Sequence, residues 1–216
     1  MNQQIKGVLF DLDGTLIDSH DLILASFRYA IGEVLGKDFS DEVYMAKVGQ
    51  PLATQMWDFT DDEDVHTELL RVYREHNARV HDSMVSVFPH VSDVLSELRA
   101  HQVSLGVVTS KIEKIARCGL RACGIEDFFA FVVSPSNFPE HKPAPGPVLH
   151  GAELLGLAPS ECLYVGDSPY DLQSGKAAGS LTAAALWGMF SKDCLLAEKP
   201  DFVCESMLDV ATAVLG

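Results

Sequence analysis

Short apolar runs alternate along the chain with longer stretches whose apolar residues recur every three or four positions. Runs typical of buried strands occupy residues 7–10, 103–110, 128–135, 162–168 and 180–188. Stretches with the repeat of amphipathic helices occupy residues 91–101, 112–124 and 145–156, and a closing strand and helix are expected over 200–215. Strands that alternate with helices form βαβ units, so the pattern predicts an α/β fold with a Rossmann-like, doubly wound parallel sheet.

Residues 17–84 interrupt this alternation, because no strand-like run occurs between the first strand and Val85. Their apolar spacing predicts helices instead, the first of them capped by Ser19. Further helices are expected over 41–48 and most of 62–82. We therefore predict two domains: a core of residues 1–16 and 85–216, and a helical domain of residues 17–84 inserted directly after the first strand.

Composition narrows the class of protein. The chain has 216 residues, of which 47% are hydrophobic, enough for a sizeable core. It contains no long apolar stretch and no signal-peptide pattern, and its five cysteines form no CxxC pair. We interpret the protein as cytoplasmic, without a membrane partner, with reduced and mostly buried thiols, and as a monomer or homodimer. The formal net charge of −15 argues against nucleic acid as a partner, whereas a small anionic substrate needs only local cations.

Two carboxylates follow the first strand. In FDLDGT, one residue separates Asp11 from Asp13, so both side chains leave an extended backbone on the same side, and Gly14 permits a sharp turn. A strand that runs into an Asp/Gly turn explains this motif equally well. Otherwise, like charges this close need a cation or a shared proton, and oxygen donors without His or Cys favour Mg²⁺ over zinc. An EF-hand does not fit, because its calcium-binding loop lies between helices.

Polar residues also end the later strands. Thr109 and Ser110 in VVTS present hydroxyls suited to a phosphate oxygen, although such residues at a helix start are as often only caps. Asp167 follows the run at 162–166. Because ligands bind beyond the carboxyl ends of parallel strands, we expect Asp11, Thr109 and Asp167 to meet at one edge of the sheet.

Two neighbouring segments contribute further candidates. Ser168 and Asp171 in SPYD predict a helix cap with a capping-box acid, so Asp171 is expected to act as a cap or supporting group rather than as a metal ligand. Lys142 lies in the Pro-rich loop HKPAP, where a lysine usually faces solvent. Each of these signals is weak when taken alone.

In this order and spacing, the segments FDLDGT, VVTS, HKPAP and VGDSPYD resemble the haloacid dehalogenase superfamily of aspartate-nucleophile phosphohydrolases. The match spans almost the whole chain, and the helical insertion is similar to that family's C1 cap. The resemblance implies that Asp11 is the nucleophile, that Asp13 is the general acid and base, and that Thr109 and Lys142 bind phosphate. It also implies that Asp11, the main-chain carbonyl of Asp13 and Asp167 hold Mg²⁺.

The predicted cap carries hints of the substrate. Residues 47–52, KVGQPL, resemble substrate-contact loops of phosphoglycolate phosphatases and bacterial inorganic pyrophosphatases, which makes Lys47 and Gln50 candidate contacts. For Lys47, a surface position in an ordinary turn is the commoner role. Residues 73–85 are more similar to the pyrophosphatases. One departure is Ala144 in KPAP, where relatives often have an aspartate. The resemblance implies a Mg²⁺-dependent phosphohydrolase of phosphoglycolate-type esters or inorganic pyrophosphate that forms an aspartyl-phosphate.

Other functions remain open from the sequence. A sugar phosphomutase similar to β-phosphoglucomutase would use the same core and return the phosphoryl group to a sugar phosphate. A phospho-accepting receiver module also unites acids, a hydroxyl and a lysine, but it needs neither a helical insertion nor the second aspartate. A catalytically dead binding protein is disfavoured because no motif residue is missing. The chain lacks GxxxxGK[ST] and GxSxG motifs, which argues against NTPases and serine hydrolases.

Overall fold

The core of the molecule is one parallel sheet. A computed structural model describes residues 5–216, and every strand pairing in this six-stranded sheet is parallel. The strand order is β5 (Val132–Val133), β4 (Ser104–Val108), β1 (Gly7–Phe10), β6 (Cys162–Gly166), β7 (Leu181–Ala185) and β8 (Phe202–Cys204). The first strand thus occupies the centre, and the chain winds outward on both sides of it. The predicted doubly wound α/β fold is confirmed.

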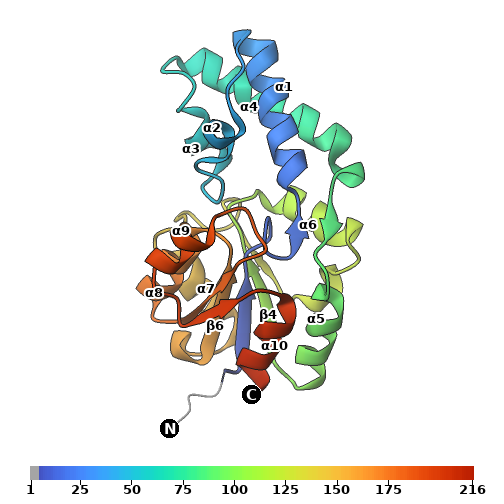
Figure 1. The fold of residues 1–216 in the computed structure, drawn as a ribbon, viewed down its shortest axis with the longest axis vertical. Helices are drawn as coiled ribbons and strands as arrows, with labels where there is room; N and C mark the ends of the chain where they lie inside the picture. Colours follow the sequence, from blue (N-terminus) through green and yellow to red (C-terminus); the bar gives the residue numbers. More distant parts are fainter. Residues whose placement is uncertain (1–4) are drawn as a thin grey trace.

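Helices cover both faces of the sheet, on opposite sides of it in Figure 1. One face is covered by α5 (Val91–Ala100), α6 (Glu113–Ala122) and α10 (Met207–Leu215), the other by α7 (Gly146–Leu155), α8 (Pro169–Ala178) and α9 (Lys192–Ala197). Strand β1 serves both faces: Val8 and Phe10 pack with the first group and Leu9 with the second. Because side chains alternate along a strand, a strand buried on both sides must be apolar throughout.

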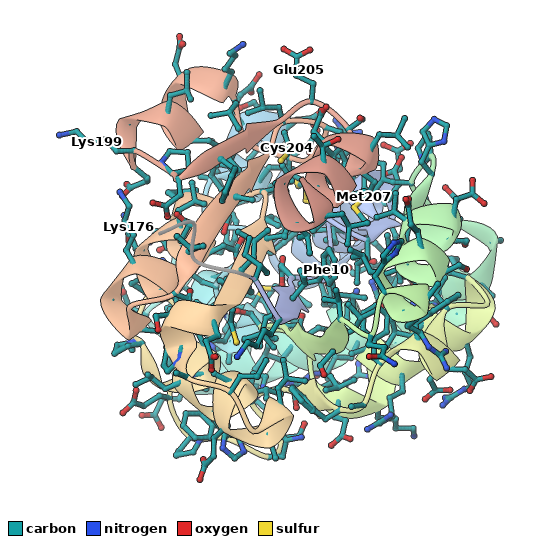
Figure 2. All side chains as sticks on the ribbon, turned by 90° about the horizontal axis from the view of Figure 1, so that it is seen from below. Phe10, Lys176, Lys199, Cys204, Glu205 and Met207 are labelled. Carbon is teal, nitrogen blue, oxygen red and sulfur yellow. The ribbon has the colours of Figure 1, made fainter. Side chains whose placement is uncertain are left out.

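The packed interior lies between these layers. Figure 2 shows Phe10 among the strands and Cys204 beside the last helix, which begins at Met207, whereas Lys199 and Glu205 project outward. Phe10 is fully buried and meets the ring of Phe129 edge-on at 6.2 Å. Cys162 and Cys204 are buried, but the other three cysteines are partly exposed, so the expectation of mostly buried thiols was wrong; all five are free.

Residues 20–83, here called the helical segment, stand above the carboxyl edge of the sheet in Figure 1. They form α1 (His20–Leu35), α2 (Asp41–Met45), α3 (Leu52–Met56), α4 (Glu63–Val80) and a 3₁₀ turn (His81–Ser83). Their apolar faces build a separate cluster around the ring of Phe27, which stacks with Tyr44 and meets Tyr73 edge-on. Asp62 caps α4 by accepting hydrogen bonds from two main-chain N–H groups.

A two-residue ribbon joins the helical segment to the sheet. Strand β2 (Ile17–Asp18) pairs antiparallel with β3 (Ser86–Val87), so the outgoing and returning chains run side by side. This pairing was not predicted, because two residues are too few for a periodic pattern. The short helix α3 was likewise not predicted. Residues 128–135 contain a strand only at Val132–Val133, and a 3₁₀ turn at Glu126–Phe128 precedes it.

None of the helices in the described part of the chain has the length and apolar character that crossing a bilayer requires.

The buried face of α5 should carry much of the stability of the core. Leu98 is fully buried in the main cluster, whereas Leu208 on α10 is 48% exposed. We expect Leu98→Ala to lower the free energy of unfolding by about 2–5 kcal/mol, because it leaves a cavity. Leu208→Ala, the matched control, should lower it by about 0.5 kcal/mol or less. Urea denaturation measures both, and equal losses would contradict this view of the core.

Candidate active site

The carboxyl edge of the sheet gathers the polar residues predicted from the strand ends. The register places Phe10 beside Val107 of β4 and Val165 of β6, so Asp11, Thr109 and Asp167 follow at nearly the same level. Asp11, Thr109 and Asp167 are all buried. The expectation that parallel strands bring them to one edge agrees with this placement.

Lys142 enters this edge from the loop before α7. Its ammonium lies 2.8 Å from Oδ1 of Asp11 and 2.6 Å from Oδ1 of Asp171, and its side chain is only 1% exposed. It does not face solvent, as most loop lysines do. Burial alone would lower the pKa of Lys142, but the charges of Asp11 and Asp171 outweigh burial and raise that pKa above its usual value.

Asp171 is held by donors on both of its oxygens. Oδ2 accepts hydrogen bonds from the main-chain N–H and the hydroxyl of Ser168, in the capping box that opens α8. Oδ1 accepts from Tyr164 at 2.9 Å as well as from Lys142. This carboxylate therefore caps the helix, as its sequence position predicts, and it also holds the lysine that faces Asp11.

Asp167 is clamped between two loops. Its Oδ1 accepts from the Thr15 hydroxyl at 3.1 Å, and its Oδ2 accepts from the N–H of Met189 at 2.7 Å. A Cβ atom on Gly14, where φ is +84°, or on Gly188 would lie 2.2 Å from an atom of this carboxylate side chain. Only glycine lets both loops come this close.

The carboxylates of Asp11, Asp167 and Asp171 form the acidic centre of the site. They are buried, and each offers an oxygen within 4.8 Å of the others. Burial raises the pKa of Asp11 to about 7, although Lys142 opposes it. Burial, followed by the charge of Asp11, also raises the pKa of Asp167. The protein itself thus supplies too little positive charge for this many acids, and the hard oxygen donors fit a divalent cation.

Asp13 lies at the side of this centre and is not one of the three clustered acids. Its Oδ1 receives hydrogen bonds from the Ser19 hydroxyl and from the ammonium of Lys111, each at 2.6 Å. The sequence predicted that the side chain of Ser19 caps α1. It does not, because the Ser19 hydroxyl binds Asp13 instead. Lys111 was missed by the sequence analysis. Its position directly after VVTS was the available signal.

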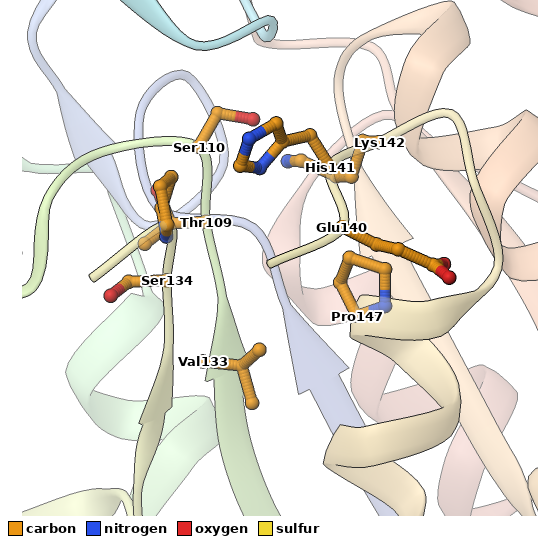
Figure 3. Close-up of a pocket in the computed structure, with 9 residues that line it drawn as sticks. Thr109, Ser110, Val133, Ser134, Glu140, His141, Lys142 and Pro147 are labelled. Atoms are coloured by element: carbon orange, nitrogen blue, oxygen red, sulfur yellow. The ribbon is translucent and has the colours of Figure 1, made fainter. Parts of the chain in front are cut away.

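A pocket opens between the end of β4 and the loop that carries Lys142. Figure 3 shows Thr109 and Ser110 on one side of it, with His141 and Lys142 opposite. The Thr109 hydroxyl accepts a hydrogen bond from the N–H of Lys111 at 3.1 Å, so its own proton remains available for an anion. Hydroxyl and ammonium groups that face one pocket are suited to bind phosphate oxygens.

The helical segment touches this edge through the turn at residues 48–50. The Ser110 hydroxyl donates to the carbonyl of Gly49 at 2.5 Å, and a Cβ atom on Gly49 would lie 2.9 Å from the Ser168 hydroxyl. Gln50 is partly buried in the same turn, and its carbonyl accepts from Gln55.

Lys47 is not turned toward these groups. Its exposed ammonium pairs with Asp58 at 2.5 Å within the helical segment. The structure thus gives Lys47 no contact with the clustered site residues, and its role as a substrate contact stays a prediction.

Comparison with known proteins gives consistent results. The family model described as haloacid dehalogenase-like hydrolase matches residues 8–185. The pyrophosphatase PpaX of Oceanobacillus iheyensis is 38% identical over 210 residues, 97% of each chain, and that of Bacillus pumilus is 35% identical over 99% of each chain. A solved structure, a predicted phosphoglycolate phosphatase from Haemophilus somnus, superposes with a TM-score of 0.91 at 26% identity and covers 99% of each chain.

The raised pKa of Asp11 makes the stability of the metal-free protein depend on pH. Asp11 loses its proton near pH 7 in the folded chain, against 3.8 for its ordinary value. Between these values the unfolded chain has released the proton that the folded chain keeps. The contribution of Asp11 to the free energy of unfolding should therefore fall by a few kcal/mol as pH rises from about 4 to about 7, and the raised pKa of Asp167 adds to the decline.

Asp11→Asn should reduce this slope and make the metal-free protein more stable than the wild type at pH 8. Denaturant unfolding at several pH values in the presence of EDTA measures the free energy of unfolding and its slope with pH. Asp61→Asn, at an exposed position of the helical segment, is the control and should keep the wild-type slope. An unchanged slope in Asp11→Asn would show that burial does not disfavour the Asp11 charge.

Proposed function

This chain belongs to the haloacid dehalogenase-like hydrolase family, and from that premise we propose that it hydrolyses inorganic pyrophosphate through a covalent phosphoryl group on Asp11. The resemblance read from its four motifs is confirmed. It is a phosphohydrolase that acts on a small phosphorylated substrate. The identity of that substrate and the role of each residue are the proposal.

The choice of pyrophosphate is supported by the extent of the similarity. The two pyrophosphatases match at 38% and 35% identity across nearly the full chain, the helical segment included. Thr109 and Lys142 would bind the transferred phosphoryl group, so the leaving group would be selected by other residues beside this pocket, on the sheet edge or on the helical segment. Phosphoglycolate is the second candidate, because the Haemophilus somnus structure superposes on both parts. The acidic surface does not oppose either substrate, since charges beyond about 8 Å are largely screened.

The single observation that carries the mechanism is the buried ion pair of Asp11 with Lys142 at the strand ends. Asp11 attacks phosphorus, and the leaving group departs on the opposite side. Lys142 uses two of its three N–H donors on Asp11 and Asp171, so the third can bind a phosphate oxygen. The Thr109 hydroxyl faces the same pocket and would bind another. Phosphoryl transfer depends mainly on such positioning and charge neutralisation.

Mg²⁺ is the proposed cofactor. It would be held by Asp11, Asp167 and the main-chain carbonyl of Asp13. The oxygens of Asp171 would continue to accept hydrogen bonds from Ser168, Tyr164 and Lys142. When bound, it would neutralise the repulsion between the Asp11 carboxylate and the substrate phosphate. Without its cation, such a site should raise the pKa values of its carboxylates, and those of Asp11 and Asp167 are raised.

Asp13 is the proposed general acid and base. It would protonate the leaving oxygen and later take a proton from the water that hydrolyses the aspartyl-phosphate. Ser19 and Lys111 hold the same oxygen of this carboxylate, which leaves its other oxygen for the proton transfers. We propose that the helical segment is the cap that excludes bulk water while these steps occur.

The turn at residues 48–50 would close the site by resting on Ser110 and Ser168. We retain Gln50 as a substrate contact from this turn. We also propose a cytoplasmic location, which suits five free thiols.

The nucleophile is tested by Asp11→Asn, which keeps the shape of the side chain but cannot be phosphorylated. Release of phosphate from pyrophosphate with Mg²⁺ should fall at least about 10³-fold, and EDTA should abolish it in the wild type. Circular dichroism checks that the fold persists. Near-normal turnover in Asp11→Asn would refute the assignment. Transfer to a sugar phosphate without phosphate release would indicate a mutase, and a long-lived phosphoaspartate would indicate a receiver.

Closure of the helical segment is tested at Gly49, where φ is +100° and an added Cβ meets Ser168. Gly49→Ala should lower kcat/KM for pyrophosphate about 10-fold or more, because the turn cannot seat on the core. Gly36→Ala is the matched control: its φ is +62°, but nothing lies within 4 Å of the new atom. It should lower stability by about 1 kcal/mol and leave kcat/KM unchanged. Equal kinetic losses in both variants would show that backbone strain, not closure, matters.

A further inference from the structure

Lys111 is a second sheltered cation at this edge of the sheet, and the proposed chemistry uses it only to hold one oxygen of Asp13. Its side chain is 15% exposed, as is that of Asp13, to which it donates at 2.6 Å. Lysines that form ion pairs elsewhere are far more open: Lys6 is 52% exposed and Lys192 is 57% exposed. Removing an ammonium from water is unfavourable unless partners compensate for the lost hydration. The sheltered position of Lys111 therefore suggests that this lysine has a specific role.

The position of Lys111 is set by its neighbours along the chain. Thr109 and Ser110 precede it, and its N–H binds the Thr109 hydroxyl, so the phosphate pocket and Lys111 share one short loop. Ser110 in turn holds the turn of the helical segment through the Gly49 carbonyl. Lys111 therefore stands where the sheet edge, the acid Asp13 and the helical segment come together.

Asp13 relates Lys111 to the departing group. A general acid must lie within about 3.2 Å of the oxygen that it protonates. The Lys111 ammonium is 2.6 Å from Oδ1 of Asp13, and the oxygen left for proton transfer is on the same carboxylate, so the ammonium can be at most about 8 Å from the leaving oxygen.

We propose that Lys111 binds the anionic leaving group of the substrate and so makes the enzyme selective for leaving groups that carry their own charge. The inference rests on the proposed function and deepens it. Lys142 faces the transferred phosphoryl group from one side, and Lys111 faces the distal group from beside Asp13. The second phosphoryl group of pyrophosphate and the carboxylate of phosphoglycolate share this anionic chemistry, and an uncharged alcohol lacks it.

An ammonium can fill this role without releasing Asp13. It has three N–H donors, and its described side-chain contact with Asp13 uses one of them. An arginine would be bulkier and planar, so it would keep the charge but change the geometry. The selectivity of Lys111 therefore depends on both its charge and its reach.

The rival role for Lys111 is to orient Asp13 only. In that case its loss would impair every substrate alike, because all of them need the same acid. In the proposed role its loss impairs anionic leaving groups selectively. The ratio of kcat/KM between substrates therefore separates the two roles even when total activity falls.

The experiment compares wild type, Lys111→Met, Lys111→Arg and Lys6→Met with pyrophosphate, phosphoglycolate and p-nitrophenyl phosphate in saturating Mg²⁺. Lys6→Met is the matched control, because it removes an ion pair of the same 2.6 Å length at the opposite end of β1. We expect Lys111→Met to lower kcat/KM about 30- to 100-fold for the anionic substrates, largely through KM, and about 3-fold or less for p-nitrophenyl phosphate. Lys111→Arg should recover part of the loss, and Lys6→Met should lose nothing.

A binding measurement removes the dependence on turnover. With Asp11→Asn as background, calorimetry should show that Lys111→Met weakens methylenediphosphonate binding about 30-fold or more but leaves inorganic phosphate binding nearly unchanged. Equal weakening of both ligands, or equal kinetic loss for all substrates, overturns the inference.

Failure of the proposed function is distinguishable from failure of this inference. A wild type that cleaves phosphoglycolate but not pyrophosphate would refute pyrophosphate as the substrate, yet a selective loss in Lys111→Met would still support the role of Lys111. A wild type with no preference for either anionic substrate over p-nitrophenyl phosphate would overturn that role.

Discussion

The buried ammonium of Lys142 is the interaction on which the site depends. It stands between Asp11 and Asp171, at 2.8 and 2.6 Å, in a place that water hardly reaches. One cation cannot balance the clustered acids, and burial leaves Asp11 with a pKa of about 7. The site is thus held in an unfavourable electrostatic state that a bound cation would relieve. Active sites often lower the stability of a protein in this way, because activity can require a destabilised arrangement of charges.

The loop after β7 contacts both the helical segment and the acidic centre of the site. The loop after β7 donates to Asp167 through the N–H of Met189, while the Met189 side chain packs on the apolar cluster of the helical segment. From the same loop, Trp187 donates to the carbonyl of Thr15, next to the acidic pair. The position of the helical segment and the position of Asp167 are therefore linked through a few residues, which is the kind of contact that a closing cap requires.

The contacts that hold Lys142 all come from the sheet domain, and Lys111 lies where this domain meets the helical segment. Ala144 in HKPAP does not prevent Lys142 from contacting Asp11 and Asp171. Asp171 already has donors on both oxygens, so no additional acid is needed to hold Lys142. Differences in substrate should therefore arise beside Asp13, where Lys111 and the helical segment meet.

The sequence by itself determined the sheet, the order of its helices and the acids and hydroxyls at its edge. These features follow from local periodicity and from the rule that parallel strands end on one side. Only the tertiary structure decided the partners of those residues. Ser19 was predicted to be a cap but binds Asp13, and Lys111, which the sequence did not single out, pairs with the same carboxylate. The ribbon of β2 and β3 joins segments far apart in the chain. Local patterns report burial and backbone shape, whereas a contact between distant segments depends on how whole elements pack, and that information is not local.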